Sequence, residues 1–226
     1  MFRSSLEADP HLRFLFVDDG STDDTADVLR ALAKHPRAAA ALLPANVGKA
    51  EAVRQGIQAA LREPAADAVG FWDADLATPL EEIRRLAAVL EARPEVEIVL
   101  GARVQLLGHS IQRKASRHYA GRIAATVASG LLGLPVYDTQ CGAKLFRVTP
   151  RLPALFAEPF STRWAFDVEI LARWLGGGDR AAALERIVEV PVGRWEDVDG
   201  SKLTRQDFLR TPADLARIYW RYRDLL

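Results

Sequence analysis

The chain has 226 residues, of which 49% are hydrophobic and 27% charged, as in globular proteins with a sizeable core. Its formal net charge is zero, so overall charge gives no argument for a nucleic-acid partner. The single cysteine, Cys141, excludes an intramolecular disulfide and fits a reducing compartment. No apolar run approaches the roughly 18 residues of a membrane-spanning helix, and no signal-peptide pattern is present. We therefore expect a cytoplasmic protein, at most peripheral at the inner face of the cell membrane.

Apolar β-type runs alternate with amphipathic helical patterns along the first hundred residues. Strands are expected over 13–19, 38–44, 67–75 and 96–103. Helices are expected between them, the first capped by Ser21 or Thr22 and the third opened by Thr78 and Pro79. This alternation predicts an α/β fold with a mostly parallel sheet covered by helices on both faces.

The regular alternation of strand and helix patterns ends in the second half of the chain. A basic stretch leads into a helix expected over about 117–132, and a Trp-containing helix is expected near 164–175. The last segment predicts an amphipathic helix that starts at Thr211, with Pro212 in its first turn. We favour packing of this helix on its own domain, with contact to a membrane surface as the alternative.

Two pairs of aspartates follow predicted strands. Asp18 and Asp19 end the first, while Asp73 and Asp75 end the third and share one face if that strand persists. Open α/β sheets bind ligands at the carboxyl ends of their strands, so both pairs are expected at one edge. A lone D-x-D is more often a helix cap or solvated turn, but the second pair favours a site. Such carboxylates predict Mg²⁺ or Mn²⁺ bridging to substrate phosphates.

Basic residues are concentrated between positions 103 and 122, where no acid occurs. The candidates for phosphate binding are Arg103, Arg113, Lys114 and Arg117. Arginine binds phosphate through a planar, bidentate fork, whereas the alternative interpretation of this cluster is a solvated basic face. Together with the acids, the cluster predicts a diphosphate substrate and an anionic second substrate.

Several motifs carry a family resemblance. The segments "FLFVDDGSTDDTADVL", "NVGKAEAVRQGI", "DADLATP" and "GAR" resemble, in order and spacing, the inverting glycosyltransferases of family 2, which have a GT-A fold. The later "GRIAATVASGLLGLPVYDTQCGAKLFR", "WAFDVEIL" and "VEVPVGRWEDVDGSK" resemble the dolichyl-phosphate β-glucosyltransferase and polyprenyl-phosphate glycosyltransferase branch. The similarity runs from about Arg13 to Lys202. It implies transfer of a sugar, most naturally glucose from UDP-glucose, to a polyprenyl or dolichyl phosphate, with inversion and a divalent metal.

The resemblance also implies roles for individual residues. Those expected in catalysis are Asp75, Arg103, Arg117 and Gln140, and those expected to bind metal are Asp73 and Asp75. Those expected to bind the nucleotide, donor or acceptor are Asp18, Asp19, Lys49, Asp73, Arg113, Lys114, Trp164 and Lys202. Packing is the alternative for Trp164 and the expectation for Cys141. The acceptor phosphate, with a second pKa of about 6, needs no general base near neutral pH.

Family members usually begin with a strand that this sequence, starting "MFRSSLEADPHLRFLFVDD", does not show. We therefore expect a GT-A domain over 1–204 without its first strand, followed by a C-terminal helix over 205–226. Unpaired strand edges would result, and a homodimer or strand exchange is the expected compensation. Two other functions stay open. One is transfer to a sugar hydroxyl with Asp167 or Glu169 as base; the other is a non-catalytic nucleotide-sugar-binding module.

Overall fold

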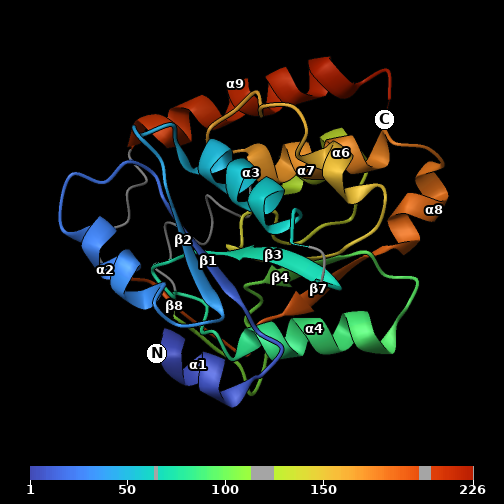
Figure 1. The fold of residues 1–226 in the computed structure, drawn as a ribbon. Coiled ribbons are helices and arrows are strands. Elements are labelled where there is room, and N and C mark those ends of the chain that lie inside the picture. Colours follow the sequence, from blue (N-terminus) through green and yellow to red (C-terminus); the bar gives the residue numbers. More distant parts are fainter. Residues whose placement is uncertain (64–65, 113–124, 199–204, 226) are drawn as a thin grey trace.

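The computed structural model describes residues 1–63, 66–112, 125–198 and 205–225 (Figure 1). Its strands are β1 (Phe14–Asp18), β2 (Ala38–Leu42), β3 (Ala68–Trp72), β4 (Ile98–Ala102), β5 (Ser110–Gln112), β6 (Ala143–Arg147), β7 (Ile187–Pro191) and β8 (Arg194–Glu196). Its helices are α1 (Phe2–Ala8), α2 (Thr25–Leu32), α3 (Lys49–Ala60), α4 (Glu82–Ala92), α6 (Leu152–Leu155), α7 (Phe166–Leu175), α8 (Arg180–Glu185) and α9 (Arg205–Tyr222). Residues 125–132 are also helical.

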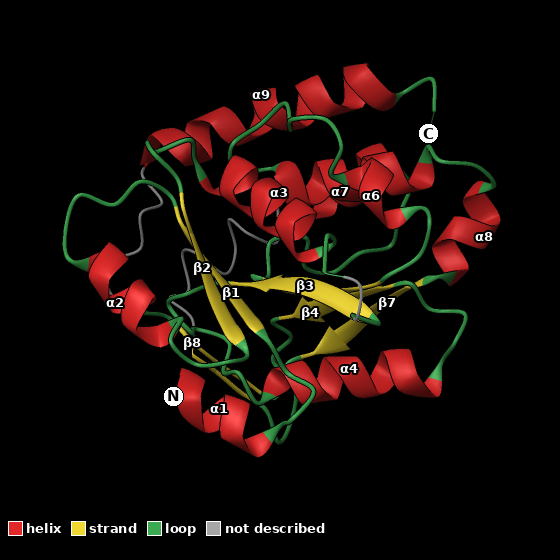
Figure 2. Cartoon of the chain, in the orientation of Figure 1, coloured by secondary structure: helices red, strands yellow, loops and turns green. Residues whose placement is uncertain are grey.

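The strands form a split, mostly parallel sheet. β1 pairs with β2 in parallel, while a second sheet has the order β3-β6-β4-β7. β6 is antiparallel to both of its neighbours, and β4 pairs with β7 in parallel. The short strands β5 and β8 form a further parallel pair. Helices lie on both faces of the sheets (Figure 2), so the predicted α/β architecture is confirmed, with β6 as the antiparallel exception.

The core lies on both faces of β4. Ile98 and Leu100 belong to a cluster shared with α3 and α7, whereas Val99 belongs to a second cluster with Leu86 and Leu90 of α4. Figure 1 shows α3, α6 and α7 on one side of this sheet and α4 on the other. Because successive strand side chains alternate between faces, a strand buried on both sides is apolar at every position, as β4 is.

β1 and β3 are less completely buried than β4. The side chains of Phe14–Val17 and of residues 69–72 are half-buried although almost all are apolar, whereas every residue of β4 is buried. Helix α3 packs against both β1 and β3, yet the two strands are not paired with each other. Within the described part of the chain, each therefore has one backbone edge without a strand partner.

Strand β3 is shorter than the sequence suggests. It ends at Trp72, and Asp73 and Asp75 lie in the turn that follows, so the expectation that they share a strand face is wrong. The chain leaves the strand because Leu76 adopts a positive φ of 55° and the Asp75 carboxylate accepts the Ala77 N–H at 3.0 Å. A side chain that bonds its own backbone two residues on favours a turn over an extended strand.

Two helix starts also differ from expectation. α2 begins at Thr25 with Asp24 as its N-cap residue, because the Ser21 hydroxyl instead donates to Asp18 at 2.5 Å. α9 begins at Arg205, so Pro212 lies inside it rather than in its first turn. The local cost of an internal proline is offset by tertiary packing, since Leu215, Ile218 and Tyr222 are buried in the core that α7 shares.

None of the helices within the described residues is both long and apolar enough to span a bilayer. The final helix, α9, lies across the outer side of α7 (Figure 1). Its buried side chains join the main core, which agrees with the packing interpretation of this segment.

Candidate active site

The turn after β3 meets the first residue of α3. The Lys49 ammonium lies 2.6 Å from Oδ1 of Asp73, and both side chains are about one third exposed. The Asp73 N–H donates to the Gly142 carbonyl at 2.9 Å, which fastens the turn to the start of β6. The carboxylate of Asp73 is seated directly on Gly142, where an added Cβ would lie 2.0 Å from Oδ2. Asp75, two residues on, is exposed.

The two acids at the end of β1 have different partners. Asp18 is buried and accepts hydrogen bonds from both the N–H and the hydroxyl of Ser21, so it shapes the turn. Asp19 accepts the N–H groups of Val47 at 2.7 Å and Gly48 at 3.0 Å, immediately before α3. The end of β1 is therefore tied to the N-terminus of α3, and that helix brings Lys49 to Asp73. The prediction that both acidic pairs lie at one edge agrees with this geometry.

Aromatic rings and a buried ion pair lie behind Lys49. Its ammonium is 5.9 Å from the ring centroids of both Trp164 and Phe166. Burial alone would lower the pKa of Lys49, but Asp73 and Asp167 outweigh burial and hold the pKa above its ordinary value. Asp167, itself buried, pairs with the buried Lys144 at 2.6 Å. Burial raises the pKa of Asp167 in spite of the two nearby ammonium groups.

Arg103 immediately follows β4 and is held by Asp138. Its Nε and NH2 groups donate to the two carboxylate oxygens of Asp138 at 2.6 and 2.8 Å, and its guanidinium lies over Trp195. Burial would lower the pKa of Arg103, but the Asp138 carboxylate outweighs burial and raises it. Such a bidentate pair uses the fork that would otherwise bind a phosphate. Arg103 therefore holds the 137–140 loop in this structure.

Gln140 lies between this ion pair and the rings. Its N–H donates to Asp138 at 3.1 Å, and its side-chain amide donates to the Trp164 carbonyl at 3.4 Å. Glu189 also holds the 137–140 loop, because its carboxylate accepts the N–H groups of Tyr137 and Asp138, both at 2.7 Å. Gln140 and Trp164 are thus brought to the region of Lys49.

The donor set fits a hard divalent cation. Asp73 and Asp75 offer carboxylate oxygens from one turn. Because residue 142 is glycine, there is room for the Asp73 carboxylate, and any larger residue would fill that space. Across the described ranges, no group of three or more His, Cys, Asp or Glu side chains could hold a metal. Further ligands would have to come from substrate oxygens and water, as is usual where Mg²⁺ is bound through one or two carboxylates and phosphates.

Comparison with known families agrees with this geometry. The family model of glycosyl transferase family 2 matches residues 1–150, which is more than half of the chain. This chain belongs to glycosyl transferase family 2. Curated relatives include dolichyl-phosphate beta-glucosyltransferases of Trichomonas vaginalis, Drosophila melanogaster and Homo sapiens, which are 32%, 34% and 30% identical over 90%, 92% and 92% of this chain. The chain spans 58%, 63% and 63% of their respective lengths.

Solved structures establish the GT-A fold of this family 2 chain. It matches glucosyl-3-phosphoglycerate synthase from Mycobacterium tuberculosis, in complex with Mn²⁺, UDP and phosphoglyceric acid, with a TM-score of 0.66 at 22% identity, over 96% of this chain and 70% of that one. It matches mannosyl-3-phosphoglycerate synthase from Rubrobacter xylanophilus with a TM-score of 0.65 at 20% identity, over 97% of this chain and 66% of that one. The fold class expected from the sequence is therefore confirmed.

Four of the residues predicted for the site lie outside the described residues. They are Arg113, Lys114, Arg117 and Lys202. The sequence alone assigns no role to Asp138 or Gly142, although both lie in residues 138–142 ("DTQCG"), within one of the segments that carry the family resemblance. Both residues lie two positions from Gln140, a predicted site residue, and this proximity in the sequence is the signal that could have identified them. Arg163, which lies against Gly48 and donates to Asn46 at 3.0 Å, had no such signal.

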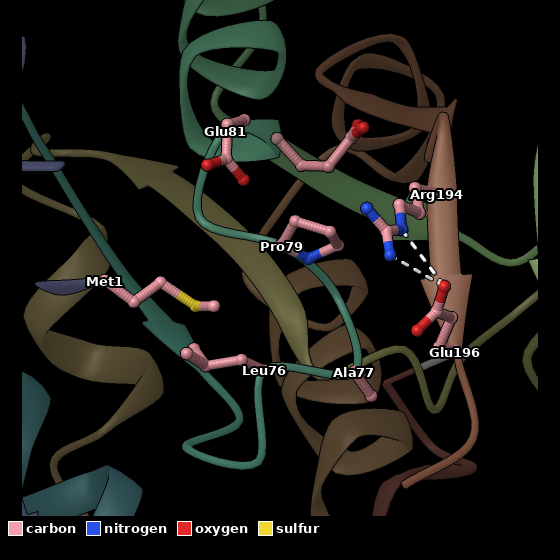
Figure 3. A pocket seen from close by; sticks show the side chains of 8 residues that line it. Met1, Leu76, Ala77, Pro79, Glu81, Arg194 and Glu196 are labelled. Carbon is pink, nitrogen blue, oxygen red and sulfur yellow. Dashed lines mark hydrogen bonds and ion pairs between the residues drawn. The ribbon is translucent and has the colours of Figure 1, made fainter. Parts of the chain in front are cut away.

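A pocket adjoins the segment that follows β3 (Figure 3). Leu76, Ala77 and Pro79 line it, together with three glutamates and Arg194, which forms an ion pair with Glu196 at 2.8 Å. Neither Lys49 nor an aspartate of the turn contributes to its lining. Because its charged groups are mainly carboxylates, this pocket is unsuited to a diphosphate. The Lys49–Asp73 region is the better candidate for donor binding.

Proposed function

We propose that this family 2 chain transfers glucose from UDP-glucose to a polyprenyl phosphate such as dolichyl phosphate, with inversion and with a divalent metal. The observation that carries the proposal is the meeting of the Asp73–Asp75 turn, Lys49 and the Asp19-anchored N-terminus of α3 at one sheet edge. The similarity to dolichyl-phosphate beta-glucosyltransferases over about nine tenths of the chain supports the donor sugar and acceptor. A neighbouring structure that contains Mn²⁺ and UDP supports the metal and nucleotide.

The proposed chemistry is a direct displacement at the anomeric carbon. Asp73 and Asp75 would hold the cation, which supplies positive charge against the leaving diphosphate. Lys49 adds a second positive charge at the same edge, and Asp19 keeps the start of α3 in place. A phosphate acceptor is already mostly ionised near neutral pH, so the chain needs to align it rather than deprotonate it.

Transfer to a sugar hydroxyl is the weaker alternative because it needs a carboxylate base. Asp167 is buried against Lys144, so it does not face a solvent-filled site. Glu169 is fully buried and accepts hydrogen bonds from Ser161, Arg173 and Tyr222. Neither carboxylate is placed to take a proton from an acceptor.

We place the reaction at the cytoplasmic face of a membrane, where a polyprenyl phosphate would be reached. Helix α9 offers one feature in support: Trp220 is 62% exposed, and the Arg223 guanidinium lies 4.3 Å from its ring centroid. Exposed Trp beside Arg is the pattern of surfaces that contact lipid headgroups. Binding to vesicles that carry polyprenyl phosphate would support this placement, and recovery of the chain only in the supernatant would oppose it.

The test is calorimetric titration of UDP and UDP-glucose with and without Mn²⁺, on wild type and D75A. We expect metal-dependent binding that D75A weakens at least about tenfold, because one of two carboxylate ligands is lost. D27A is the matched control, since Asp27 is an exposed aspartate on α2 that pairs with Arg30. Glucose transfer to a polyprenyl phosphate is then assayed on the same proteins. Metal-dependent UDP binding without glucose transfer would favour the non-catalytic module, and absence of UDP binding by a folded wild type would contradict the proposed function.

A further inference from the structure

Charges of alternating sign run from the core to the surface at the proposed donor site. Lys144, which is buried on β6, pairs with Asp167 at the start of α7. The negative charge of Asp167 in turn helps to raise the pKa of Lys49, the first residue of α3. Lys49 forms an ion pair with Asp73. The two ammonium groups and two carboxylates come from three elements and a turn. Of the four, only Lys49 and Asp73 are partly exposed.

The two lysines are held differently. Lys144 donates to the Cys141 carbonyl at 2.6 Å as well as pairing with Asp167, and it is 1% exposed. Lys49 is 29% exposed, and its contacts are the Asp73 carboxylate and two aromatic rings. A flexible four-carbon stem carries its compact charge, so the Lys49 ammonium can move where that of Lys144 cannot.

We propose that Lys49 is a built-in counter-ion that competes with the divalent cation for Asp73 and passes to the diphosphate when nucleotide and cation bind together. This rests on the proposed function and adds a regulatory role for Lys49 at the same site. The ammonium lies 2.6 Å from Oδ1 of Asp73, so a dication at this carboxylate would be repelled at close range. A diphosphate brings negative charge that satisfies both cations.

The consequence is a pair of opposite effects from one substitution. Removing the charge of Lys49 leaves Asp73, Asp75 and Asp167 with one cation fewer, so a metal ion alone should bind more tightly. The same change removes a positive charge from the diphosphate site, so UDP with metal should bind less tightly. A purely structural role for Lys49 would weaken both, and a role only toward the nucleotide would leave binding of metal alone unchanged.

The experiment measures Mn²⁺ alone by the electron paramagnetic resonance signal of the free ion, and UDP at saturating Mn²⁺ by calorimetry. The proteins are wild type, K49M, K49R and K34M, each checked by circular dichroism and thermal unfolding. K34M removes the same charge from an exposed position, which controls for net charge. We expect K49M to bind Mn²⁺ about fivefold or more tightly and UDP about tenfold more weakly, and K34M to stay close to wild type in both. K49R, which keeps the charge, should lie nearer to wild type than K49M.

The outcomes separate this inference from the proposed function. Unchanged or weaker Mn²⁺ binding by folded K49M overturns the counter-ion role, even where wild type binds UDP with Mn²⁺ and the proposed function stands. Tighter Mn²⁺ binding by K49M supports competition for Asp73, even where UDP binds neither protein and the proposed function fails. The same gain in K34M would assign the effect to net charge and overturn the inference.

Discussion

At the scale of single residues, the site depends on one small side chain as much as on its charged groups. Gly142 lies just before β6 and has no side chain, and the Asp73 carboxylate occupies the space where a Cβ of residue 142 would lie. Its carbonyl also accepts the Asp73 N–H, so backbone and side chain of the acidic turn are both set by this position. Asp73 can present its oxygens beside Lys49 because nothing larger than hydrogen occupies that space.

We predict that G142A weakens UDP–Mn²⁺ binding about tenfold or more while the chain stays folded. The new Cβ would lie 2.0 Å from Oδ2 and 2.1 Å from Cγ of Asp73, so the carboxylate must move. Calorimetry gives the affinity, and circular dichroism checks the fold. G130A is the matched control: Gly130 is exposed and helical, with nothing within 4 Å of an added Cβ. Equal affinities of G142A and wild type would contradict the seating role.

At the scale of elements, α9 is attached to α7 by a buried polar contact as well as by apolar side chains. The Tyr222 hydroxyl donates to Glu169 at 2.8 Å and accepts from Arg173 at 3.0 Å. Glu169 also pairs with Arg173 at 2.9 Å and is fully buried, so its charge must be satisfied inside the protein. The last helix therefore completes the surroundings of a carboxylate that the sequence suggested as a base.

We predict that Y222F lowers the free energy of unfolding by about 1–2 kcal/mol, because a buried carboxylate loses one donor. Urea denaturation gives the value, and Y219F, at a position 36% exposed, should differ little from wild type. Burial raises the pKa of Tyr222, so the native state favours the neutral phenol. The stabilisation that the Tyr222 hydroxyl gives to the native state is complete below about pH 10 and is lost as the pH rises further. Identical midpoints for Y222F and wild type would count against the contact.

At the scale of the whole molecule, the sheet is split between β1 and β3. Helix α3 covers both strands, and each retains an edge that lacks a strand partner among the described residues. Their apolar side chains are only half-buried. Exposed apolar edges are templates for pairing with another strand, so self-association through this split is the expected behaviour of the chain.

We predict concentration-dependent dimerisation in the tens of micromolar, measured by size-exclusion chromatography with light scattering. A68K should weaken it about fivefold, because a lysine at the exposed start of β3 opposes edge pairing. A39K, at an exposed position of β2 away from the split, is the control. A monomer at every concentration would refute self-association. If A39K weakened dimerisation more than A68K, the dimer contact would lie at β2 rather than at the split.

Local pattern determined much of this protein in advance. The alternation of apolar strands and amphipathic helices predicted the α/β fold, and the ordered motifs predicted the family, because periodicity and motif spacing are properties of short segments. The acids that follow β1 and β3 lie close together, as expected for strand ends in an open α/β fold, because the start of α3 contacts both of them. These features needed no knowledge of how distant segments pack.

Only the tertiary structure decided how the charged groups are paired. Arg103 was expected at a phosphate, but Asp138, 35 residues away, holds its fork. Glu169 was an alternative base, but Arg173 and Tyr222 enclose it. β6 enters between β3 and β4 in the antiparallel sense, which brings Gly142 beneath Asp73. A carboxylate or guanidinium takes the partner that folding places beside it, so its role depends on contacts between segments far apart in the chain.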